Sequence, residues 1–338
     1  MPPTSYTVRD QRIAPNVVLA PMEGVTDLTF RRLIRRIGGA GLTCTEFIPS
    51  VSLKAGGGKA WNTAQFDPDE RPVSVQLYGR DPLVLAEAAR VVEGMGATFC
   101  DINMGCPSKS VCANSGGSSL LKDPGLVRQI VRSVRRAISI PLTVKMRSGF
   151  DATRRNAPEI AWICQEEGAE AVTVHWRTRE DRYGGVRAVD KIAEVKARVA
   201  VPVIGNGDIV DVESALAMFA DTGCDGVMIG RGAMRNPWLL LQISQAIAGQ
   251  PVEAVTGEQR RAVLLGFLAE IRELFGADAP TLGRFKKVAN YFTLGLPHGD
   301  EVRTALLRSH SVPEVVDKAE AYFSRLRAYE AGDPAAFL

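Results

Sequence analysis

Short apolar segments rich in β-branched residues alternate with segments of helical period between residues 16 and 230, and this alternation restricts the fold more than any other feature. Eight segments have strand character: Asn16–Ala20, Leu42–Glu46, Val73–Leu77, Ala97–Ile102, Pro141–Lys145, Ala171–His175, Val201–Gly205 and Gly226–Ile229. Their nearly continuous apolar character is typical of parallel strands buried on both faces. Eight strand–helix units over roughly 250 residues predict an α/β fold of the TIM (β/α)8 barrel type. An open doubly wound sheet is the alternative, although no G-x-G-x-x-G follows the first strand.

The strand pattern ends after residue 238, and the remaining sequence has helical spacing only. Thr256-x-x-Gln259 is a capping box before a long helical run, and Ser311-x-x-Glu314 opens a second one. We therefore expect two domains, a catalytic barrel over residues 1–242 and a small all-α helical bundle over residues 243–338.

The composition, with 46% hydrophobic and 23% charged residues, is ordinary for a soluble globular enzyme. A formal net charge of +3 does not by itself indicate a nucleic-acid partner but leaves room for local basic patches. The six cysteines show neither a C-x-x-C pair nor metal-ligand spacing, so we expect reduced thiols and no metal site. The amino-terminal residues lack the apolar core of a signal peptide, and no stretch approaches the about eighteen apolar residues of a membrane span. We expect a cytoplasmic protein without a membrane partner.

A polar or backbone-special residue follows nearly every predicted strand, where TIM barrels have their active sites. In strand order these residues are Pro21 and Met22, Glu46, Gln76, Asn103 and Cys106, Lys145, His175, Asn206, Gly207 and Asp208, and Gly230 and Arg231. A lysine inside an apolar run, such as Lys145, is unfavourable to bury unless it is paired or used. The set predicts a functional site at the carboxyl ends of the strands.

Cys106 lies in the most distinctive stretch of the chain, Asp101–Leu121. Pro107 cannot donate to a sheet ladder, so the preceding strand must end by Cys106. Gly105 frees the backbone to turn just before the cysteine. A cysteine at the mouth of a strand suits a reactive role, and the alternative is a small buried apolar residue.

The turns after the last two strands have the character of an anion site. Gly207 and Gly230 let backbone N–H groups approach an anion that Arg231 can neutralise, at the usual position of a barrel phosphate site. Sugar-phosphate isomerases and aldolases share this pattern, and two ordinary tight turns are the structural alternative. Lys145 and His175 come from neighbouring predicted strands and could flank a ring such as a flavin, whose reduced anion a cation would stabilise. Taken alone, His175 could also be a core histidine.

Six segments, in order along the chain, form a specific set of motifs. They are APMEGVTD (Ala20–Asp27), DINMGCP (Asp101–Pro107), VKMR (Val144–Arg147), VHWRT (Val174–Thr178), IGNGDI (Ile204–Ile209) and MIGRG (Met228–Gly232). This set resembles the signatures of the tRNA-dihydrouridine synthases, most of all their bacterial B-type branch. The helical tail is similar to the RNA-binding domain of that family.

The resemblance implies an FMN-dependent oxidoreductase that uses NADPH or NADH to reduce the C5–C6 bond of specific uridines in the tRNA D-loop. It implies a hydride from reduced FMN to uracil C6 and a proton from Cys106 to C5. The FMN-binding residues that it implies are Pro21, Met22, Gln76, Lys145, His175, Asn206, Gly207, Asp208, Gly230 and Arg231. The sequence departs from the family at Trp176, where glycine is expected, and the indole could stack on a base or on the flavin.

RNA binding requires a basic surface for phosphates. The candidate substrate and RNA contacts are Asn103, Lys109, Arg147, Arg177, Arg284, Lys286 and Lys287. The alternative is that the basic side chains among them belong to solvated helix faces. We expect four arginines of the first barrel helix to face solvent away from the site: Arg31, Arg32, Arg35 and Arg36.

Two other functions remain open at this point. A small-molecule FMN barrel oxidoreductase of the dihydropyrimidine or dihydroorotate dehydrogenase type also pairs FMN with a uracil-like ring, although the helical bundle and the basic loops argue against it. A non-catalytic RNA-binding protein would not need Cys106, Lys145 and His175. In each case we expect a monomer.

Overall fold

The computed structural model describes residues 2–108, 111–112, 116–182 and 184–337, with the backbone alone at residues 290 and 291. In this part of the chain, eight parallel strands form one closed barrel: β3 (Val17–Leu19), β4 (Leu42–Cys44), β6 (Val73–Tyr78), β7 (Phe99–Met104), β8 (Leu142–Arg147), β9 (Ala171–His175), β10 (Val203–Asn206) and β11 (Gly226–Ile229). They pair in the order β4-β3-β11-β10-β9-β8-β7-β6, and β4 pairs with β6 to close the barrel. Each predicted strand overlaps one of these strands, so the predicted TIM barrel is confirmed.

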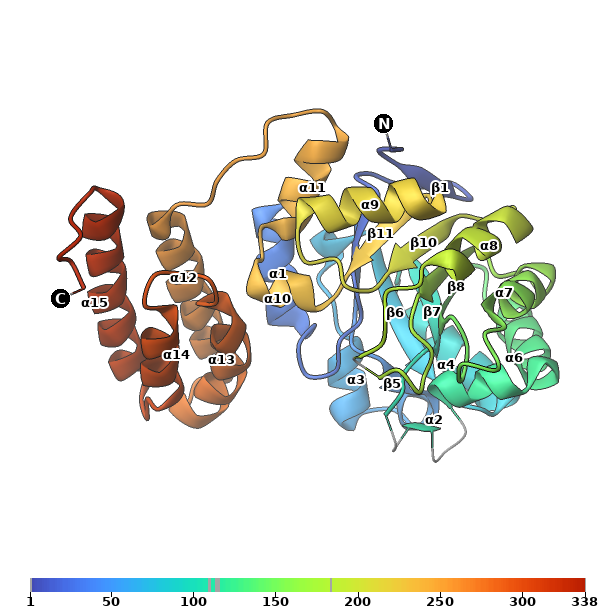
Figure 1. The fold of residues 1–338 in the computed structure, drawn as a ribbon. Coiled ribbons are helices and arrows are strands. Elements are labelled where there is room, and N and C mark those ends of the chain that lie inside the picture. Colours follow the sequence, from blue (N-terminus) through green and yellow to red (C-terminus); the bar gives the residue numbers. More distant parts are fainter. Residues whose placement is uncertain (1, 109–110, 113–115, 183, 338) are drawn as a thin grey trace.

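Helices surround the barrel and connect its strands (Figure 1). They are α1 (Leu28–Ile37), α4 (Pro82–Gly94), α6 (Pro124–Ala137), α7 (Ala157–Glu166), α8 (Asp190–Arg198) and α9 (Val212–Thr222), with α10 (Arg231–Arg235) and α11 (Leu239–Ile247) after β11. The connection from β4 to β6 carries β5 (Ile48–Pro49), α2 (Ser50–Lys54), α3 (Gly58–Ala64) and the 3-10 helix η1 (Pro68–Glu70), and η2 (Gly117–Lys122) follows β7. Asp81-Pro82 and Asp123-Pro124 begin α4 and α6 in the same way, with the aspartate side chain as N-cap and proline in the first turn.

The amino-terminal hairpin, β1 (Tyr6–Val8) and β2 (Gln11–Ile13), was not predicted. Its buried side chains pack with the inward-facing residues of the barrel in one apolar cluster. The ring of Tyr6 lies so close to Gly226, the first residue of β11, that a Cβ there would be 2.9 Å from the ring. The hairpin therefore closes the amino-terminal end of the barrel.

The tail forms a bundle of four helices among the described residues, beside the barrel on the side of α1 and α10 (Figure 1): α12 (Gly257–Phe275), α13 (Asp278–Phe292), α14 (Gly299–Leu307) and α15 (Val312–Glu330). The Thr256–Gln259 capping box is confirmed, and Ser311 caps α15. Residue 242 lies inside α11, whereas residues 248–256 form no helix or strand. We propose the domain boundary in this segment rather than at residue 242.

The expectation that the α1 arginines face solvent is wrong for Arg31, whose side chain is fully buried. Its guanidinium pairs with the buried Glu70 carboxylate, with 3.1 Å between Nη2 and Oε2. It also donates to the carbonyl oxygens of Thr26 (2.8 Å) and Gln65 (2.7 Å). The charge is buried because the segment before β6 folds over this face of α1 and supplies the Glu70 carboxylate and the Gln65 carbonyl oxygen. By contrast, the side chain of Arg36 is 61% exposed.

We expect Arg31→Met to lower the free energy of unfolding of the protein by about 3–5 kcal/mol, because it leaves the buried Glu70 carboxylate without its partner. Urea denaturation followed by tryptophan fluorescence measures this change. Arg36→Met, which removes an exposed arginine from the same helix, is expected to change the free energy by less than about 1 kcal/mol. The double variant Arg31→Met/Glu70→Met should recover much of the loss, and equal effects of the two single variants would contradict the interpretation.

Candidate active site

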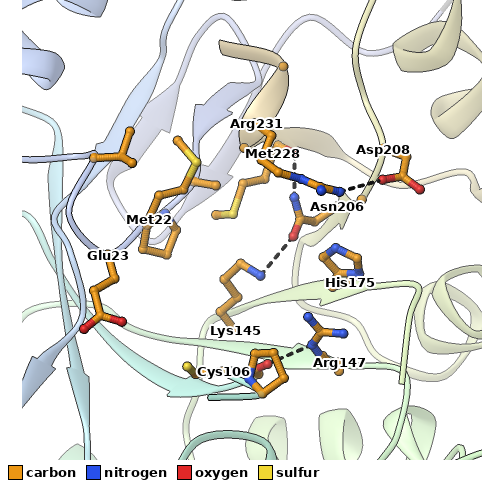
Figure 2. Close-up of a pocket in the computed structure, with 18 of the residues that line it drawn as sticks. Met22, Glu23, Cys106, Lys145, Arg147, His175, Asn206, Asp208, Met228 and Arg231 are labelled. Atoms are coloured by element: carbon orange, nitrogen blue, oxygen red, sulfur yellow. Dashed lines mark hydrogen bonds and ion pairs between the residues drawn. The ribbon is translucent and has the colours of Figure 1, made fainter. Parts of the chain in front are cut away.

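A cavity of about 710 Å³ opens at the carboxyl ends of the barrel strands. This volume lies in the range of small-molecule and cofactor sites. Twelve of the predicted site residues line it: Pro21, Met22, Asn103, Cys106, Lys145, Arg147, His175, Asn206, Gly207, Asp208, Gly230 and Arg231. Figure 2 shows Lys145 and His175 near the centre of the cavity, with Cys106 on one side and Arg231 on the other.

The Asn103 side chain shapes the turn that carries Cys106. Its Oδ1 accepts hydrogen bonds from the backbone N–H groups of Gly105 (3.0 Å) and Cys106 (2.8 Å). On the far side of the turn, the Cys106 carbonyl accepts from the Ser118 N–H (3.1 Å) and hydroxyl (2.9 Å). The cysteine is thus held on both sides by local hydrogen bonds. Burial raises the pKa of its thiol, although the Ser108 N–H acts in the opposite direction.

Gln76 lies behind this turn and is not part of the cavity lining. Its Oε1 accepts from Asn103 Nδ2 (2.7 Å), and its Nε2 donates to Asp101 Oδ2 (2.6 Å). Asp101 also accepts from the Thr143 hydroxyl (2.5 Å). Both ends of the Gln76 amide are therefore used inside the protein, and this residue positions Asn103.

Lys145 lies within β8 rather than at its end, and its side chain reaches across the cavity. Its Nζ donates to Asn206 Oδ1 (2.9 Å), while Asn206 Nδ2 donates to the Met228 carbonyl (2.7 Å). The amide orientation of Asn206 is thereby set, with its oxygen toward the lysine. Burial lowers the pKa of Lys145 to about 8, and the nearby guanidinium of Arg147 acts in the same direction.

His175 is part of the cavity wall, which excludes the alternative of an isolated core histidine. The Arg177 backbone N–H donates to His175 Nδ1 (3.1 Å), so this nitrogen carries no proton. Burial, reinforced by the charge of Lys145, lowers the pKa of His175 well below its usual value. The imidazole is therefore neutral at pH 7 and keeps its single proton on Nε2, as a hydrogen-bond donor.

Trp176 is buried behind the wall and cannot stack on a ligand in the cavity, which corrects the expectation for this residue. Its side chain is 1% exposed. The ring packs against Gly207, whose φ is +118° and where a Cβ would lie 2.5 Å from the indole. Glycine is required at this position on both counts. The tryptophan thus supports the turn after β10 from behind.

Arg177 is also corrected, because it forms part of the framework of the site and not of an exposed basic surface. It is 5% exposed, and its guanidinium binds Asp208 with two hydrogen bonds (2.8 and 2.6 Å). Arg231 donates to the same carboxylate (3.3 Å), and its side chain remains 51% exposed. Asp208 therefore links a buried arginine to an accessible one at the rim of the cavity.

Arg147 is 6% exposed and lines the cavity next to the cysteine turn. Its Nε donates to the Gly105 carbonyl (2.9 Å), and its Nη1 donates to the Thr178 carbonyl (2.7 Å). This depth is unsuited to a surface phosphate contact. A ligand would meet Arg147 only inside the cavity.

Several lining residues were not predicted as site residues, among them Glu23, Phe47, Met228 and Arg235. Glu23 lies within the APMEGVTD motif and follows Met22, so it could have been predicted as a lining residue. Met228 lies within β11 and opens the MIGRG motif, whereas Phe47 and Arg235 have no distinctive local pattern. Together the charged lining residues comprise five cations and two anions: Lys145, Arg147, Arg182, Arg231 and Arg235 against Glu23 and Asp208. The described lining therefore favours an anionic ligand.

The basic residues predicted in the tail lie on α13, and each has a partner. Arg284 Nε lies 3.7 Å from Asp27 Oδ2 of the barrel, and Lys287 Nζ donates to the Gly24 carbonyl (3.1 Å). Lys286 Nζ donates to the Ser309 carbonyl within the bundle (2.7 Å). Lys109 lies outside the described residues.

Within the described ranges, no group of three or more histidine, cysteine, aspartate or glutamate side chains could hold a metal ion. The helices of the same residues include none that is long and apolar enough to cross a membrane. All six cysteines are free.

Comparison with known proteins gives one consistent family. The family described as dihydrouridine synthase matches residues 18–326. A protein of Rickettsia bellii named "Probable tRNA-dihydrouridine synthase" is 38% identical over 314 residues, which is 92% of this chain and 96% of that protein. A "tRNA-dihydrouridine synthase B" of Xanthomonas campestris is 38% identical over 317 residues, covering 94% and 95% of the two chains. One of Pseudomonas aeruginosa with the same name is 38% identical over 302 residues, covering 87% and 89%.

The lowered pKa of Lys145 predicts a pH-dependent stability. The pKa is about 8 in the folded protein and close to 10.4 in an unfolded chain, so unfolding takes up a proton between these values. The contribution of Lys145 therefore makes the free energy of unfolding rise with pH in this window. Lys145→Met removes this pH dependence. We therefore expect the free energy of unfolding of the variant, relative to that of wild type, to be about 1–2 kcal/mol lower at pH 9.5 than at pH 7. Urea denaturation at the two pH values measures the difference, and an equal difference at both would show that Lys145 has an ordinary pKa.

Proposed function

Because this chain belongs to the dihydrouridine synthase family, of the bacterial B type, we propose that it reduces the C5–C6 bond of uridines in the D-loop of tRNA, with FMN as cofactor and NADPH as reductant. The observation that carries the proposal is the placement of Cys106, Lys145 and His175 in one cationic cavity. A tRNA substrate makes the cytoplasm the compartment we propose. We also propose that the protein is a monomer.

The residues of the cavity fit FMN in charge, and the cavity volume of about 710 Å³ lies in the range of cofactor sites. Arg231 is accessible at the rim, where Asp208 holds its guanidinium. Gly207 and Gly230 have no side chain, so their backbone N–H groups are open to a ligand. Together these groups would hold the phosphate. The Lys145 ammonium and the His175 Nε2–H would donate to the ring, which Pro21 and Met22 would flank. FMN, when bound, supplies the hydride that is transferred to uracil C6.

Cys106 is the residue we propose as the acid that protonates C5. A general acid must carry its proton at the working pH, and burial raises the pKa of this thiol above its ordinary value. The Cys106 N–H donates to Asn103 and its carbonyl accepts from Ser118, so the thiol projects from a fixed backbone without being activated as a thiolate. After transfer, the thiolate takes a proton from water, and the cysteine is restored.

The substrate base must leave the folded tRNA to reach this cavity, which requires a few kcal/mol of unstacking. We propose that Arg147 and the Asn103 turn contact the extruded uracil, because both line the cavity beside Cys106. Lys109, Arg284, Lys286 and Lys287 remain proposed contacts of the phosphate backbone, with the helical domain as the tRNA-binding part. Gln76 would act indirectly, through Asn103.

We expect Cys106→Ala to lower the rate of uridine reduction by about 10²–10⁴-fold, as for the loss of a general acid. A position-resolved map of dihydrouridine in tRNA, from cells that lack this gene and are complemented with wild type or variant, measures the effect in the cell. Cys112→Ala, in the same loop, is the matched control and should restore the map. Reduction of free uracil or uridine, or oxidation of dihydroorotate, without any effect on tRNA would instead favour a small-molecule flavin enzyme.

The raised pKa of Cys106 also predicts how the oxidative half-reaction depends on pH. Reaction requires the thiol form, which burial favours by raising the pKa of Cys106, so the rate should be flat through neutral pH and fall only at alkaline pH. Single-turnover reaction of the pre-reduced enzyme with tRNA between pH 6 and 10 measures it. A rate that rises through this range would mean that the thiolate is the reactive form and that Cys106 is not the acid.

A further inference from the structure

The loop between β3 and α1, residues 20–27, forms one wall of the active-site cavity. It supplies Pro21, Met22, Glu23 and Val25 to the lining, and Figure 2 shows Met22 and Glu23 on the same side of the cavity. The loop contains no helix or strand, so side-chain contacts must hold its shape.

The barrel provides part of this support. The Thr26 hydroxyl accepts from the Met22 N–H (2.9 Å) within the loop, and the Thr26 carbonyl accepts from the buried Arg31 (2.8 Å). At the tip of the loop, the Gly24 N–H donates to the carboxylate of Glu46, which follows β4. Gly24 has a φ of +70°, a conformation that glycine adopts without strain.

Helix α13 of the bundle provides the rest. Lys287 Nζ donates to the Gly24 carbonyl (3.1 Å). The carbonyl of Gly24 is therefore bound by the helical domain, and its N–H by Glu46 of the barrel. Burial raises the pKa of Glu46, and the Gly24 N–H and the Lys287 ammonium act in the opposite direction, which agrees with their proximity. A second contact joins Arg284 to Asp27, at the end of the loop, with 3.7 Å between Nε and Oδ2.

The same helix is fastened to the barrel beside this contact. Figure 1 shows α13 on the side of the bundle that faces α10 and α1, and α13 packs against α10, the helix that begins with Arg231. The ring centroids of Phe292, in α13, and Trp238, which follows α10, are 5.8 Å apart. Lys287 therefore projects from a surface that is already docked onto the barrel.

We propose that Lys287 and Arg284 are positioning residues of the active site, through which the helical domain holds the 20–27 loop in its place against the cavity. The inference rests on the proposed function insofar as the loop flanks FMN. It gives the helical domain a role in the cavity before tRNA binds. Loss of either residue should loosen the loop, and should weaken cofactor binding without any nucleic acid present.

Adjacent lysines of α13 allow a matched comparison. Lys287 contacts the loop, whereas Lys286 donates only within the bundle, to the Ser309 carbonyl (2.7 Å), among the contacts described. Lys287→Met and Lys286→Met remove the same charge from the same helix. Lys287→Arg keeps a cationic donor and serves as the conservative variant. If both lysines acted only by attracting tRNA, the two methionine variants would behave alike.

The experiment measures hydrogen–deuterium exchange of a peptide spanning residues 20–27 and the affinity for FMN, in the full-length protein and without tRNA. We expect Lys287→Met to speed exchange in this peptide and to weaken FMN binding, each by about threefold to tenfold. Lys286→Met should change neither, and Lys287→Arg should restore most of both. The rate of flavin reduction by NADPH, again without tRNA, should follow the FMN affinity.

Unchanged exchange and FMN affinity in Lys287→Met, together with a weaker and salt-dependent affinity for tRNA, would overturn the proposal and make Lys287 a phosphate contact only. Equal changes in Lys286→Met would overturn it as well, since the loop contact would then be irrelevant. Failure of the proposed function is a separate result. A wild-type protein that does not reduce tRNA uridines would leave the exchange measurement, and hence the role of Lys287, unaffected.

Discussion

All barrel strands run parallel, and closure of the sheet through the β4–β6 pair brings their carboxyl ends to a single rim. Residues far apart in the sequence, such as Met22, Cys106 and Arg231, therefore meet in one cavity. The hairpin β1–β2 closes the opposite end with Tyr6 and Val8 packed into the barrel. The barrel interior is therefore apolar at the amino-terminal ends of the strands, and the reactive side chains lie at their carboxyl ends.

The parts of this arrangement that were predicted from the sequence depend on local signals. A lysine in an apolar run and a proline that ends a strand are visible without knowing any partner, so Lys145 and Cys106 were placed correctly in the cavity. Arg31 was wrongly predicted to face solvent because its partner, Glu70, lies 39 positions away in the sequence. No residue near the arginine indicates this pairing. Trp176 and Arg177 directly follow His175, the last residue of β9, yet only the histidine faces the cavity.

Residue type alone also left open how a polar side chain is used. Asn103 and Gln76 were both expected to touch a ligand, but only Asn103 lines the cavity. The Gln76 amide is bound by Asn103 and Asp101, and the Asn103 oxygen accepts from the backbone of the Cys106 turn. A buried amide must satisfy its donors and acceptors, and here it does so inside the protein. The effect on the cysteine is direct, since the turn fixes where the thiol lies. Such roles follow from partners that only the folded chain brings together.

Lys145 and His175 lie in the same cavity but differ in protonation state. Burial lowers the pKa of both groups. The charge of Lys145 lowers the pKa of His175 further, and the charge of Arg147 does the same to Lys145. The proton stays on the lysine, because Asn206 Oδ1 accepts from it, whereas the backbone N–H of Arg177 occupies the histidine nitrogen that would otherwise take up a second proton. At neutral pH the cavity therefore presents one ammonium and one neutral N–H donor. That pair can stabilise negative charge on a bound ring while placing only one full positive charge at the centre of the cavity.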